Sequence, residues 1–442
     1  MSRLSVPLNQ GHTAQRAFEQ QISHPPANLP APNPTKSFWI NSTPDANPLA
    51  AEGSDGTLTS DADICIIGSG ITGVGSAYHL SQAIADGKLG DDKPFTAVIV
   101  EARDFCSGAT GRNGGHLTPA VYKHFHDLQK TYGTEQAIRT LDIESHTTDA
   151  LLKIIDVQNL TGAVDLAALG RIDISITQQE QSDAKTDLKE AKEAGVDVDS
   201  VEILSEQTMN DKYGTPYPGF RFPGHNLWPL KLVTELYRIA KSRTPNFALT
   251  LHTRTPVTSI TPASSSSSST IPRRYIINTP RGPISCSYII HATNAYTSHL
   301  LPHFTGPEGI IPVRGQVIAL RAAVDRDELR PAGWVANESF EYWFPLPVKY
   351  DGGKEGSKKC PLVILGGGRE VATSPFEVYE DDDSVINEDV SLVLKDFLPG
   401  LFEGKYEKGR EPEMEWTGIM GMTKMSDPFV RILQHALRRL VF

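Results

Sequence analysis

Residues 63–75 read DICIIGSGITGVG, an apolar run followed by a glycine-rich segment. Residues 64–67 form a short apolar run that ends at a glycine, which is typical of a strand buried on both faces of a parallel sheet. The Gly-x-Gly-x-x-Gly loop that follows gives a tight turn at Gly68, room for a pyrophosphate at Gly70 and close packing of helix on strand at Gly73. The helix that begins there would present unpaired N–H groups to the phosphates. The stretch therefore predicts the first strand, loop and helix of a dinucleotide-binding fold.

A second strand and an acidic residue complete this β-α-β unit. Residues 95–101 read FTAVIVE, an apolar run that ends at Glu101. Glu101 lies 28 positions after Gly73 (101 minus 73), against about 20 in the usual pattern, and the polar loop at residues 86–93 accounts for the excess. An acid at this place accepts hydrogen bonds from the adenosine ribose and favours a ribose without a 2′-phosphate. The alternative is a surface glutamate at the end of a strand.

Composition excludes several classes of protein. The 442 residues include 42 Lys and Arg against 53 Asp and Glu, and the net charge of -11 argues against nucleic acid as a partner. The four cysteines are scattered without metal-ligand spacing, so we expect neither a metal site nor a disulfide scaffold. No apolar run is long enough to cross a membrane, and the first residues lack the apolar core of a signal peptide. We therefore expect a cytoplasmic protein of two to three domain-sized units.

Several segments around the dinucleotide motif have a simpler interpretation. Residues 1–60 predict a mostly irregular leader, in which the apolar cluster at 37–40 lies against the folded body. The serine run 264–269 predicts a long hairpin loop, and the acidic run 380–383 predicts a solvated surface. Helices are expected at 135–158, 180–194 and 230–242, and further strands at 171–177, 257–260, 275–278, 284–291, 341–347 and 361–366.

A second glycine-rich loop follows the acidic residue closely. Residues 107–116 read SGATGRNGGH, with four glycines in ten positions, so the backbone can approach a flat or charged ligand. A plain nicotinamide-binding domain gives no reason for such a loop at this place. With it, the sequence resembles the FAD-dependent oxidoreductases of the D-amino-acid oxidase type, and most closely the amine-oxidising branch with gamma-glutamylputrescine oxidase and sarcosine oxidase. The matching segments are residues 38–39, 68–73, 100–103, 107–116, 291–296, 311–316, 364–369 and 415–421.

The resemblance implies an α/β fold of two interleaved domains. The FAD-binding domain would be Rossmann-like, with a three-stranded meander, and would comprise residues 61–125, 216–310 and 413–430. A mixed-sheet domain that covers the flavin would comprise residues 126–215 and 311–412. Residues 431–442 would form an atypical tail.

The predicted cofactor is FAD, held without a covalent bond. The motif itself assigns to it Gly68, Ser69, Gly70, Ile71, Thr72, Gly73 and Glu101. The resemblance adds Ala102, Arg103, Ser107, Thr110, Arg112, Asn113, Gly114, Gly115, Val257, Thr293 and Asn294. Cys106 does not match any position at which relatives attach the flavin covalently.

The resemblance also implies the chemistry. Flavin N5 would accept a hydride from the carbon that bears a neutral amine, water would hydrolyse the imine, and dioxygen would reoxidise the flavin. The substrate would be a small amine or amino acid, and the protein would orient it, exclude water and stabilise negative charge on the reduced ring. No protein base is obligatory for this reaction.

Five residues are candidates for the substrate side of the site, and each has a structural alternative. His116 could titrate at the reacting centre or be a hydrogen-bonded structural histidine. Tyr342 and Trp343 could pack around the amine or be core aromatics. Arg314 and Arg369 could bind a substrate carboxylate or the reduced flavin, or form structural ion pairs.

The similarity to the family stops at Val430. Relatives continue with a Pro-x-Val-Gly strand and a Gly-His-Gly turn into a last helix, whose N-terminus faces the flavin pyrimidine. Here residues 431–442 place Leu433, Leu437, Leu440 and Val441 on one helical face instead. We therefore expect an altered chain end, from a frame shift, splicing or a gene-model error, that deprives the sheet of a strand and the flavin of a helix dipole.

Three functions remain open at this point. The first is an FAD-dependent amine or amino-acid oxidoreductase. The second is a flavin-binding protein with little or no turnover, and the third is a nicotinamide-dependent dehydrogenase, against which the loop at 107–116 argues.

Overall fold

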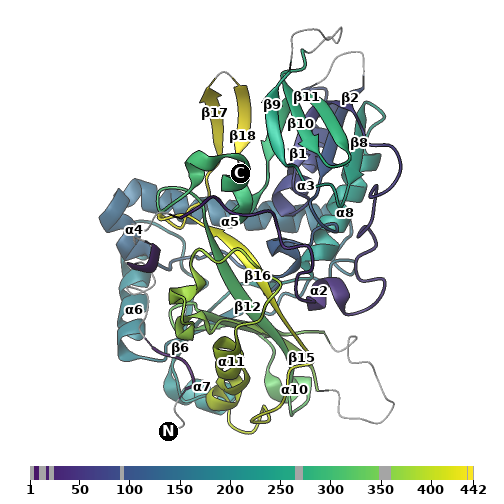
Figure 1. Cartoon of the computed structure of the whole chain (residues 1–442). Coiled ribbons are helices and arrows are strands. Elements are labelled where there is room, and N and C mark those ends of the chain that lie inside the picture. The colour runs from purple at the N-terminus through teal and green to yellow at the C-terminus, as the bar shows by residue number, and fades with distance from the viewer. Residues whose placement is uncertain are drawn as a thin grey trace.

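The computed structural model describes residues 4–8, 16–18, 24–89, 94–263, 272–347, 360–435 and 437–441. In this part of the chain, two sheets of eight strands each form the framework. Figure 1 shows the first sheet at the upper right and the second below it. The predicted serine loop at 264–269 and the whole segment 351–359 lie outside the described residues.

The first sheet contains the predicted β-α-β unit. Strand β1 (Asp61–Ile67) pairs in parallel with β2 (Phe95–Val100) on one side and with β11 (Gly282–His291) on the other. Helix α3 (Ile71–Ala85) connects β1 to β2 and packs against α8 (Pro229–Ser242). The sequence predicted each of these elements to within a few residues, because all of them have continuous apolar runs or small packing residues.

Three more strands extend this sheet on its two sides. Strand β8 (Phe247–His252) pairs in parallel with β2. Strands β9 (Ser259–Pro262) and β10 (Tyr275–Thr279) form an antiparallel meander with β11. The predicted three-stranded meander is therefore confirmed, with its first strand two residues later than expected.

The second sheet is mixed and covers the first sheet's loops. Its strands, in order across the sheet, are β16 (Met414–Met422), β12 (Ile311–Arg321), β15 (Leu362–Gly366), β14 (Glu341–Pro345), β13 (Gly333–Ala336), β4 (Arg171–Ile174), β6 (Gly219–Phe222) and β5 (Glu202–Leu204). Helix α11 (Glu388–Leu401) covers one face, where Phe397 packs with Trp343 and Trp334. The opposite face carries Tyr342 and turns towards the glycine-rich loop.

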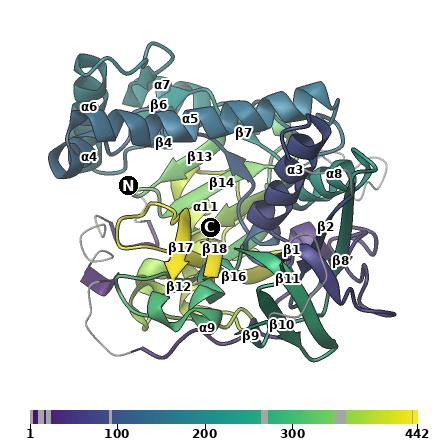
Figure 2. The same ribbon diagram turned by 90° about the horizontal axis from the view of Figure 1, so that it is seen from above.

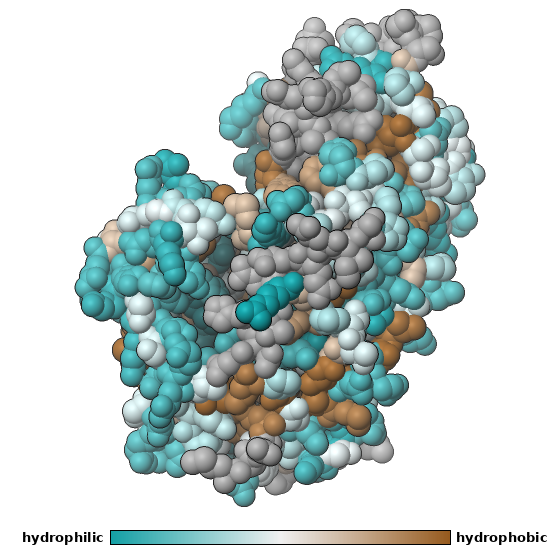
Figure 3. All heavy atoms as spheres, turned by 60° about the vertical axis from the view of Figure 1, so that its left-hand side comes forward, coloured by the Kyte–Doolittle hydropathy of each residue, from teal (hydrophilic) through white to brown (hydrophobic). Residues whose placement is uncertain are grey.

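Four helices pack on the two faces of this sheet near β4 and β6, the first three in one core cluster with Phe220 and Phe222 and the last in the cluster of Trp334 and Phe397. They are α4 (Phe125–Tyr132), α5 (Thr134–Val157), α6 (Gln178–Glu193) and α7 (Glu206–Tyr213). Figure 2 shows the long α5 lying across the strands β4, β6 and β7. The surface on this side is mostly hydrophilic, with hydrophobic residues in separate patches (Figure 3). The short elements are β3 (His116–Leu117), β7 (His225–Asn226), α2 (Phe38–Asn41), α9 (Thr297–Leu300) and α10 (Arg326–Leu329).

The leader is irregular, as predicted, but its described parts are bonded to the body at many points. Phe38, Trp39 and Ile40 are buried in the core next to α8, which confirms the prediction for residues 37–40. Val6 packs into the core under the second sheet. The amide N–H of Thr35 donates to the carbonyl of Asp383 at 2.9 Å. The leader therefore connects both sheets.

The prediction of a helical face after Val430 is wrong. Residues beyond it form the strands β17 (Arg431–His435) and β18 (Leu437–Val441), and β18 pairs in parallel with β11. The open edge of a sheet has unpaired N–H and C=O groups that can pair with any extended segment. The spacing of apolar residues within 431–442 does not reveal such a pairing. The place beside β11 that we expected to lack a strand is therefore occupied.

Sheet membership differs from the predicted domain division at two places. Strand β16 lies within 413–430, which we assigned to the first domain, but it pairs with β12 of the second sheet. Strand β6 lies within 216–310 and pairs with β4 of the second sheet.

Candidate active site

The Gly-x-Gly-x-x-Gly loop has the shape that its sequence predicts. Gly68 has φ +109°, and a β-carbon there would come within 2.4 Å of the carbonyl oxygen of Ala292. A β-carbon on Gly73 would lie 2.0 Å from the carbonyl oxygen of Gly68. Only glycine fits these two positions, and Gly70 is the N-cap of α3 without a capping side chain. The helix N-terminus is therefore accessible to an anionic group.

Glu101 lies directly beside this loop. Its Oε2 accepts hydrogen bonds from the amide N–H of Ser69 at 3.0 Å and from the Ser69 hydroxyl at 2.7 Å. Its Oε1 accepts a bond from the amide N–H of Arg103 at 3.0 Å. A carboxylate has about four acceptor positions, two on each oxygen, so Oε1 can still accept one hydrogen bond from a ribose hydroxyl.

Three consecutive carbonyls of the second glycine-rich loop accept hydrogen bonds from outside the loop. The Ser37 hydroxyl donates to the carbonyl of Gly111 at 2.6 Å, and Trp416 Nε1 donates to the carbonyl of Arg112 at 2.8 Å. Trp39 Nε1 donates to the carbonyl of Asn113 at 2.5 Å. The leader and β16 therefore fix the path of this loop from both sides.

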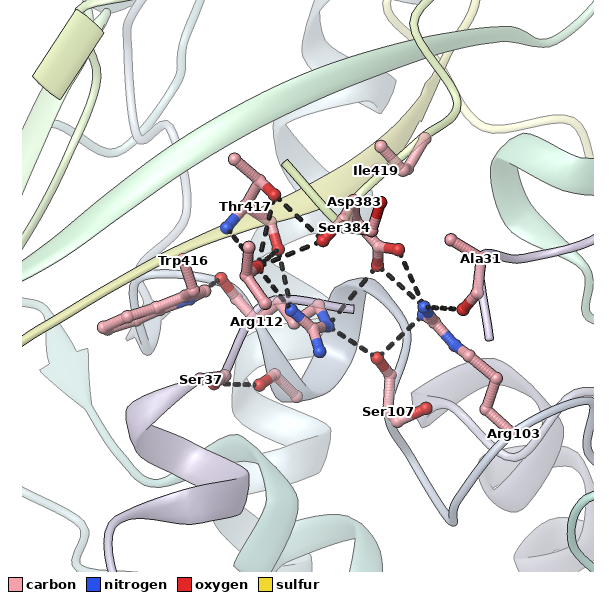
Figure 4. A network of polar contacts seen from close by, with 12 residues as sticks. Ala31, Ser37, Arg103, Ser107, Arg112, Asp383, Ser384, Trp416, Thr417 and Ile419 are labelled. Atoms are coloured by element: carbon pink, nitrogen blue, oxygen red, sulfur yellow. Dashed lines mark hydrogen bonds and ion pairs between the residues drawn. The ribbon is translucent and has the colours of Figure 1, made fainter. Parts of the chain in front are cut away.

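A buried carboxylate holds two arginines, Arg112 of this loop and Arg103 just before it. Asp383 is 1% exposed, and Arg103 Nη1 donates to its two oxygens at 2.8 and 3.0 Å. Arg112 Nε lies 3.5 Å from Asp383 Oδ2 and donates to the carbonyl of Ser107 at 2.8 Å. Figure 4 shows both guanidinium groups converging on Asp383 and Ser107. The prediction that residues 380–383 form a solvated surface is therefore wrong for Asp383, because two distant cations compensate its burial.

These bonds also determine what the two arginines can do. Arg112 Nη1 donates to the carbonyl of Thr417 at 2.9 Å and to the hydroxyl of Thr35 at 3.2 Å. Burial lowers the pKa of Arg112 to about 10, against the attraction of Asp383. For Arg103, the bond to Asp383 outweighs burial and raises the pKa. Together, the two guanidinium groups therefore connect the second glycine-rich loop to the leader and to β16. They would position the cofactor indirectly, because they hold this loop in place.

The other predicted cofactor residues lie around the same loops. Thr110 Oγ1 accepts a bond from the amide N–H of Ile71 at the start of α3, at 3.1 Å. The side-chain Nδ2 of Asn294 donates to the carbonyl of Ile419 at 3.0 Å, and its Oδ1 accepts from the N–H of Gly421 at 3.1 Å. These two bonds connect the segment after β11 to β16. Thr72 directly follows Ile71 in the chain, and Ala102 directly follows Glu101. The hydroxyl groups of Thr293 and Thr297 form a hydrogen bond with each other. Val257 directs its side chain into the core under the first sheet.

Tyr342 lies between two glycines, one from each glycine-rich segment. A β-carbon on Gly114 would come within 2.3 Å of Tyr342 Cε2, and one on Gly366 within 2.4 Å of Tyr342 Cζ. His116 packs edge-on against the Tyr342 ring, with 5.7 Å between centroids. His116 Nδ1 is 3.1 Å from the carbonyl of Gly114, so this nitrogen carries the proton and Nε2 carries the lone pair. Burial, assisted by the charge of Arg171, lowers the pKa of His116 to about 4, so the ring is neutral at neutral pH.

Arg369 and two glutamates adjoin Tyr342. Nη1 of Arg369 is buried and has no hydrogen-bond partner among the described residues. Glu341 and Glu370 share one donor, the side-chain amide of Asn337, at 2.9 and 2.8 Å. Burial raises the pKa of both carboxyl groups, and the charge of Glu370 raises that of Glu341 further. Sequence reasoning missed this pair, although each glutamate adjoins a residue that it singled out.

Two predicted substrate residues lie elsewhere. Trp343 is on the opposite face of β14, where it stacks on Trp334 with 5.8 Å between ring centroids, so it is a core aromatic. Side chains alternate along a strand, and the neighbours Tyr342 and Trp343 therefore cannot both face the loop. Arg314 Nε forms an ion pair with Glu377, and its Nη1 donates to the carbonyl of Asp382 at 3.0 Å. For both residues the structure shows the structural alternative.

Comparison with known proteins places the chain in a family. The family model described as DAO, FAD dependent oxidoreductase, matches residues 63–441, so the match continues past Val430, where we expected the similarity to end. The chain belongs to this family. The DAO assignment agrees with the resemblance seen in the sequence, and the mixed α/β architecture is the one that the family's solved structures share.

Individual relatives differ in how much of the chain they match. Gamma-glutamylputrescine oxidoreductase of Escherichia coli is 36% identical over 75 residues, which are 17% of this chain and 15% of that protein. The probable oxidoreductase OrdL of Rhizobium meliloti is 22% identical over 375 residues, 84% of this chain and 76% of that protein. The crystal structure of glycine oxidase from Geobacillus kaustophilus superposes with a TM-score of 0.59 at 17% identity, over 87% of this chain and 89% of that one.

As a DAO-family member the chain is an FAD-dependent oxidoreductase, and its residues fit FAD. The glycine-rich loop at residues 68–73 leaves the N-terminus of α3 open for the pyrophosphate. The Ser107 hydroxyl is buried and has no hydrogen-bond partner among the residues that the structure describes, at a place where a ligand oxygen could accept its hydrogen bond. In the described part of the chain, no helix combines the length and apolar character needed to cross a bilayer.

Proposed function

We propose that this DAO-family protein oxidises a C–N bond of a small amine or amino acid. The observation that carries the proposal is the position of Tyr342, which closes over Gly114 of the FAD loop with His116 and Arg369 beside it. Two of the relatives, gamma-glutamylputrescine oxidoreductase and glycine oxidase, have names that refer to an amine and an amino acid, which supports this substrate class.

Bound FAD would supply a hydride acceptor for the carbon that bears the amine, and we propose dioxygen as the final electron acceptor. The imine product would then be hydrolysed by water. The chain's own residues would bind the substrate, orient it and exclude water during the transfer.

Tyr342 would exclude water from the reacting centre. Its ring fills the space between Gly114 and Gly366, where any larger residue would clash with it. The neutral imidazole of His116, whose Nδ1 is held by the carbonyl of Gly114, would offer Nε2 as an acceptor to an amine N–H. A neutral acceptor there would favour the unprotonated amine, the form from which a hydride can leave.

Arg369 would bind a carboxylate close to the reacting carbon. Its Nη1 is buried without a partner, and a charged donor in that condition is stabilised strongly by a carboxylate. The ring of Phe340 lies below the guanidinium, with its centroid 5.4 Å from Cζ, and holds it in place.

We also propose that FAD is held without a covalent bond. Cys106 is buried, and burial together with the charge of Glu101 raises the pKa of its thiol. A thiol in this condition is a poor nucleophile. Acid precipitation of the purified protein should therefore release the flavin into the supernatant.

A flavin spectrum and anaerobic mixing test the function together. The purified protein should be yellow, and a panel of amines and amino acids should include one that bleaches it in the absence of dioxygen. A yellow protein that no member of a broad panel bleaches would support the alternative, a flavin-binding protein with little turnover. A colourless protein that binds a nicotinamide cofactor would contradict both.

A further inference from the structure

A second charged group lies on the same sheet face as Tyr342. Directly paired residues of neighbouring strands point to the same face, and the pairs Tyr342–Val335 and Val335–Asp173 connect β14 through β13 to β4. Figure 2 shows these three strands side by side under α5. Two strand spacings separate Tyr342 from Asp173, a distance of about 10 Å.

Two cations surround Asp173. Arg171 Nε and Nη2 donate to its two oxygens at 2.5 and 3.2 Å. Lys123 Nζ lies 2.8 Å from Asp173 Oδ2 and donates to the hydroxyl of Ser339 at 2.9 Å. The attraction of Arg171 and Lys123 outweighs burial and lowers the pKa of Asp173, so the carboxylate is ionised. The two cations outnumber the one carboxylate to which they bind, and a second carboxyl group, Asp187, lies within electrostatic reach of Lys123.

Polar groups without partners adjoin the cations. The amide of Asn226 is buried, and neither its oxygen nor its nitrogen has a hydrogen-bond partner among the described residues. It lies over β13 beside Arg171, since a β-carbon on Gly333, the residue paired with Arg171, would come within 2.9 Å of its Oδ1.

The hydroxyl group of Tyr122 also has no hydrogen-bond partner among the described residues. It is buried, and the Tyr122 ring packs on Phe220 and Phe222 with 5.9 Å between centroids in each case. These two phenylalanines pair with Asp173 and Arg171 across β4 and β6. Asn226 and Tyr122 therefore add uncommitted donors on two sides of the charged group.

We propose that Lys123 and Arg171 form a subsite for an anionic group, a carboxylate, at the far end of the substrate. This inference rests on the proposed function, which puts the reacting amine beside Tyr342. The side chains of Lys123 and Arg171 are 17% and 13% exposed, so a ligand can reach them. Arg369 follows β15, which lies on the side of β14 opposite to β13. It would therefore bind a carboxylate close to the amine, and not a distant one.

The substrate would therefore be an extended molecule. Its oxidisable amine and its carboxylate would be separated by about 10 Å, the distance set by the strand spacing. Short amino acids cannot span this distance, and a simple alkylamine leaves the excess positive charge uncompensated.

Matched pairs of substrates test the subsite. Straight-chain ω-amino acids of increasing length are compared with alkylamines of the same lengths, and kcat/KM is measured for each pair. We expect the acid to be preferred by about tenfold or more once the chain spans the distance, and no preference for the shortest pairs.

The variant Lys123→Met removes one cation and leaves the Arg171–Asp173 pair neutral. It should lower the acid-to-alkylamine ratio about tenfold for long chains, and Lys123→Arg should retain the preference. Lys130→Met is the matched control, because Lys130 is an exposed lysine on α4, the helix that follows Lys123, and it should leave the ratio unchanged. Flavin content and the thermal midpoint of each variant show whether it has folded.

The outcomes separate this inference from the proposed function. Equal kcat/KM for acids and alkylamines at every length, or an unchanged ratio in a folded Lys123→Met, would overturn the subsite while amine oxidation stands. If neither kind of compound reduces the flavin, the proposed function fails and the subsite fails with it.

Discussion

Gly73 lies against the carbonyl oxygen of Gly68, and a β-carbon at Gly73 would come within 2.0 Å of that oxygen. This contact closes the turn between β1 and α3 and sets the path of the backbone that meets the pyrophosphate. The backbone on both sides is regular secondary structure with a buried face, so it cannot move away without loss of packing.

The variant Gly73→Ala should therefore lose FAD. The added methyl group forces the helix from the strand, and the loop between them loses its shape. The measurement is the ratio of flavin to protein absorbance after purification. Gly75→Ala is the matched control in the same helix, because nothing lies within 4 Å of the added carbon. It should retain FAD and gain about 0.5–1 kcal/mol of stability, and equal flavin retention in both variants would refute the argument.

Asp383→Asn should destabilise the protein and weaken FAD binding. The substitution keeps the shape of the side chain but leaves Arg103 and Arg112 buried without their counter-charge, at a cost of about 3–5 kcal/mol. Chemical denaturation with a fluorescence readout and a titration with FAD measure the two effects. The exposed neighbour Asp382 provides the control, since Asp382→Asn should change neither quantity. Wild-type stability in Asp383→Asn would show that the arginines need no carboxylate.

Arg369→Met should raise KM for amino acids by about tenfold to a hundredfold, because a buried charged donor is lost from the carboxylate. Steady-state kinetics with an amino acid and with the amine that lacks its carboxylate separate this effect from general damage. Only the amino acid should be affected strongly. Arg238→Met, at an exposed site on α8, serves as the control, and an equal loss for both substrates would assign Arg369 a structural role instead.

Glu370→Gln should stabilise the protein at alkaline pH by roughly 1–2 kcal/mol. Burial raises the folded-state pKa of Glu341 and Glu370 above the unfolded value of about 4.3, so the folded state holds protons that the unfolded state has released. Stability from this source is complete below the unfolded pKa and is lost as the pH rises through the folded pKa. Glutamine cannot ionise and can donate to Glu341.

Thermal midpoints across pH measure this difference. The gain of Glu370→Gln over the wild type should grow with pH and vanish in acid. Glu403→Gln, at an exposed position after α11, should show no such trend. A constant difference at every pH would contradict the assignment.

The first sheet and its loop were predictable because local sequence determines them. Residues 64–73 contain both the buried strand and the glycines whose backbone positions exclude a side chain. The helix at α5 and the meander strands also follow from periodicity within each segment.

The rest depends on contacts between distant residues. Asp383 is 280 positions from Arg103, and an acidic run gives no sign that one of its members is buried. The strand pairing of β18 with β11, the Glu341–Glu370 pair and the cations around Asp173 arise in the same way. For Trp343 and Arg314 the sequence left a structural alternative open, because residue type alone does not tell which face of a strand is turned to the site.

The central claim is that this chain transfers electrons from a C–N bond to FAD. Anaerobic titration of the yellow protein with amines and amino acids, followed by the flavin absorbance, tests it most directly. We expect complete bleaching by at least one such compound and recovery of the colour when dioxygen is admitted. A flavin-loaded protein that stays oxidised with every amine and amino acid, but is bleached by dithionite, would contradict it.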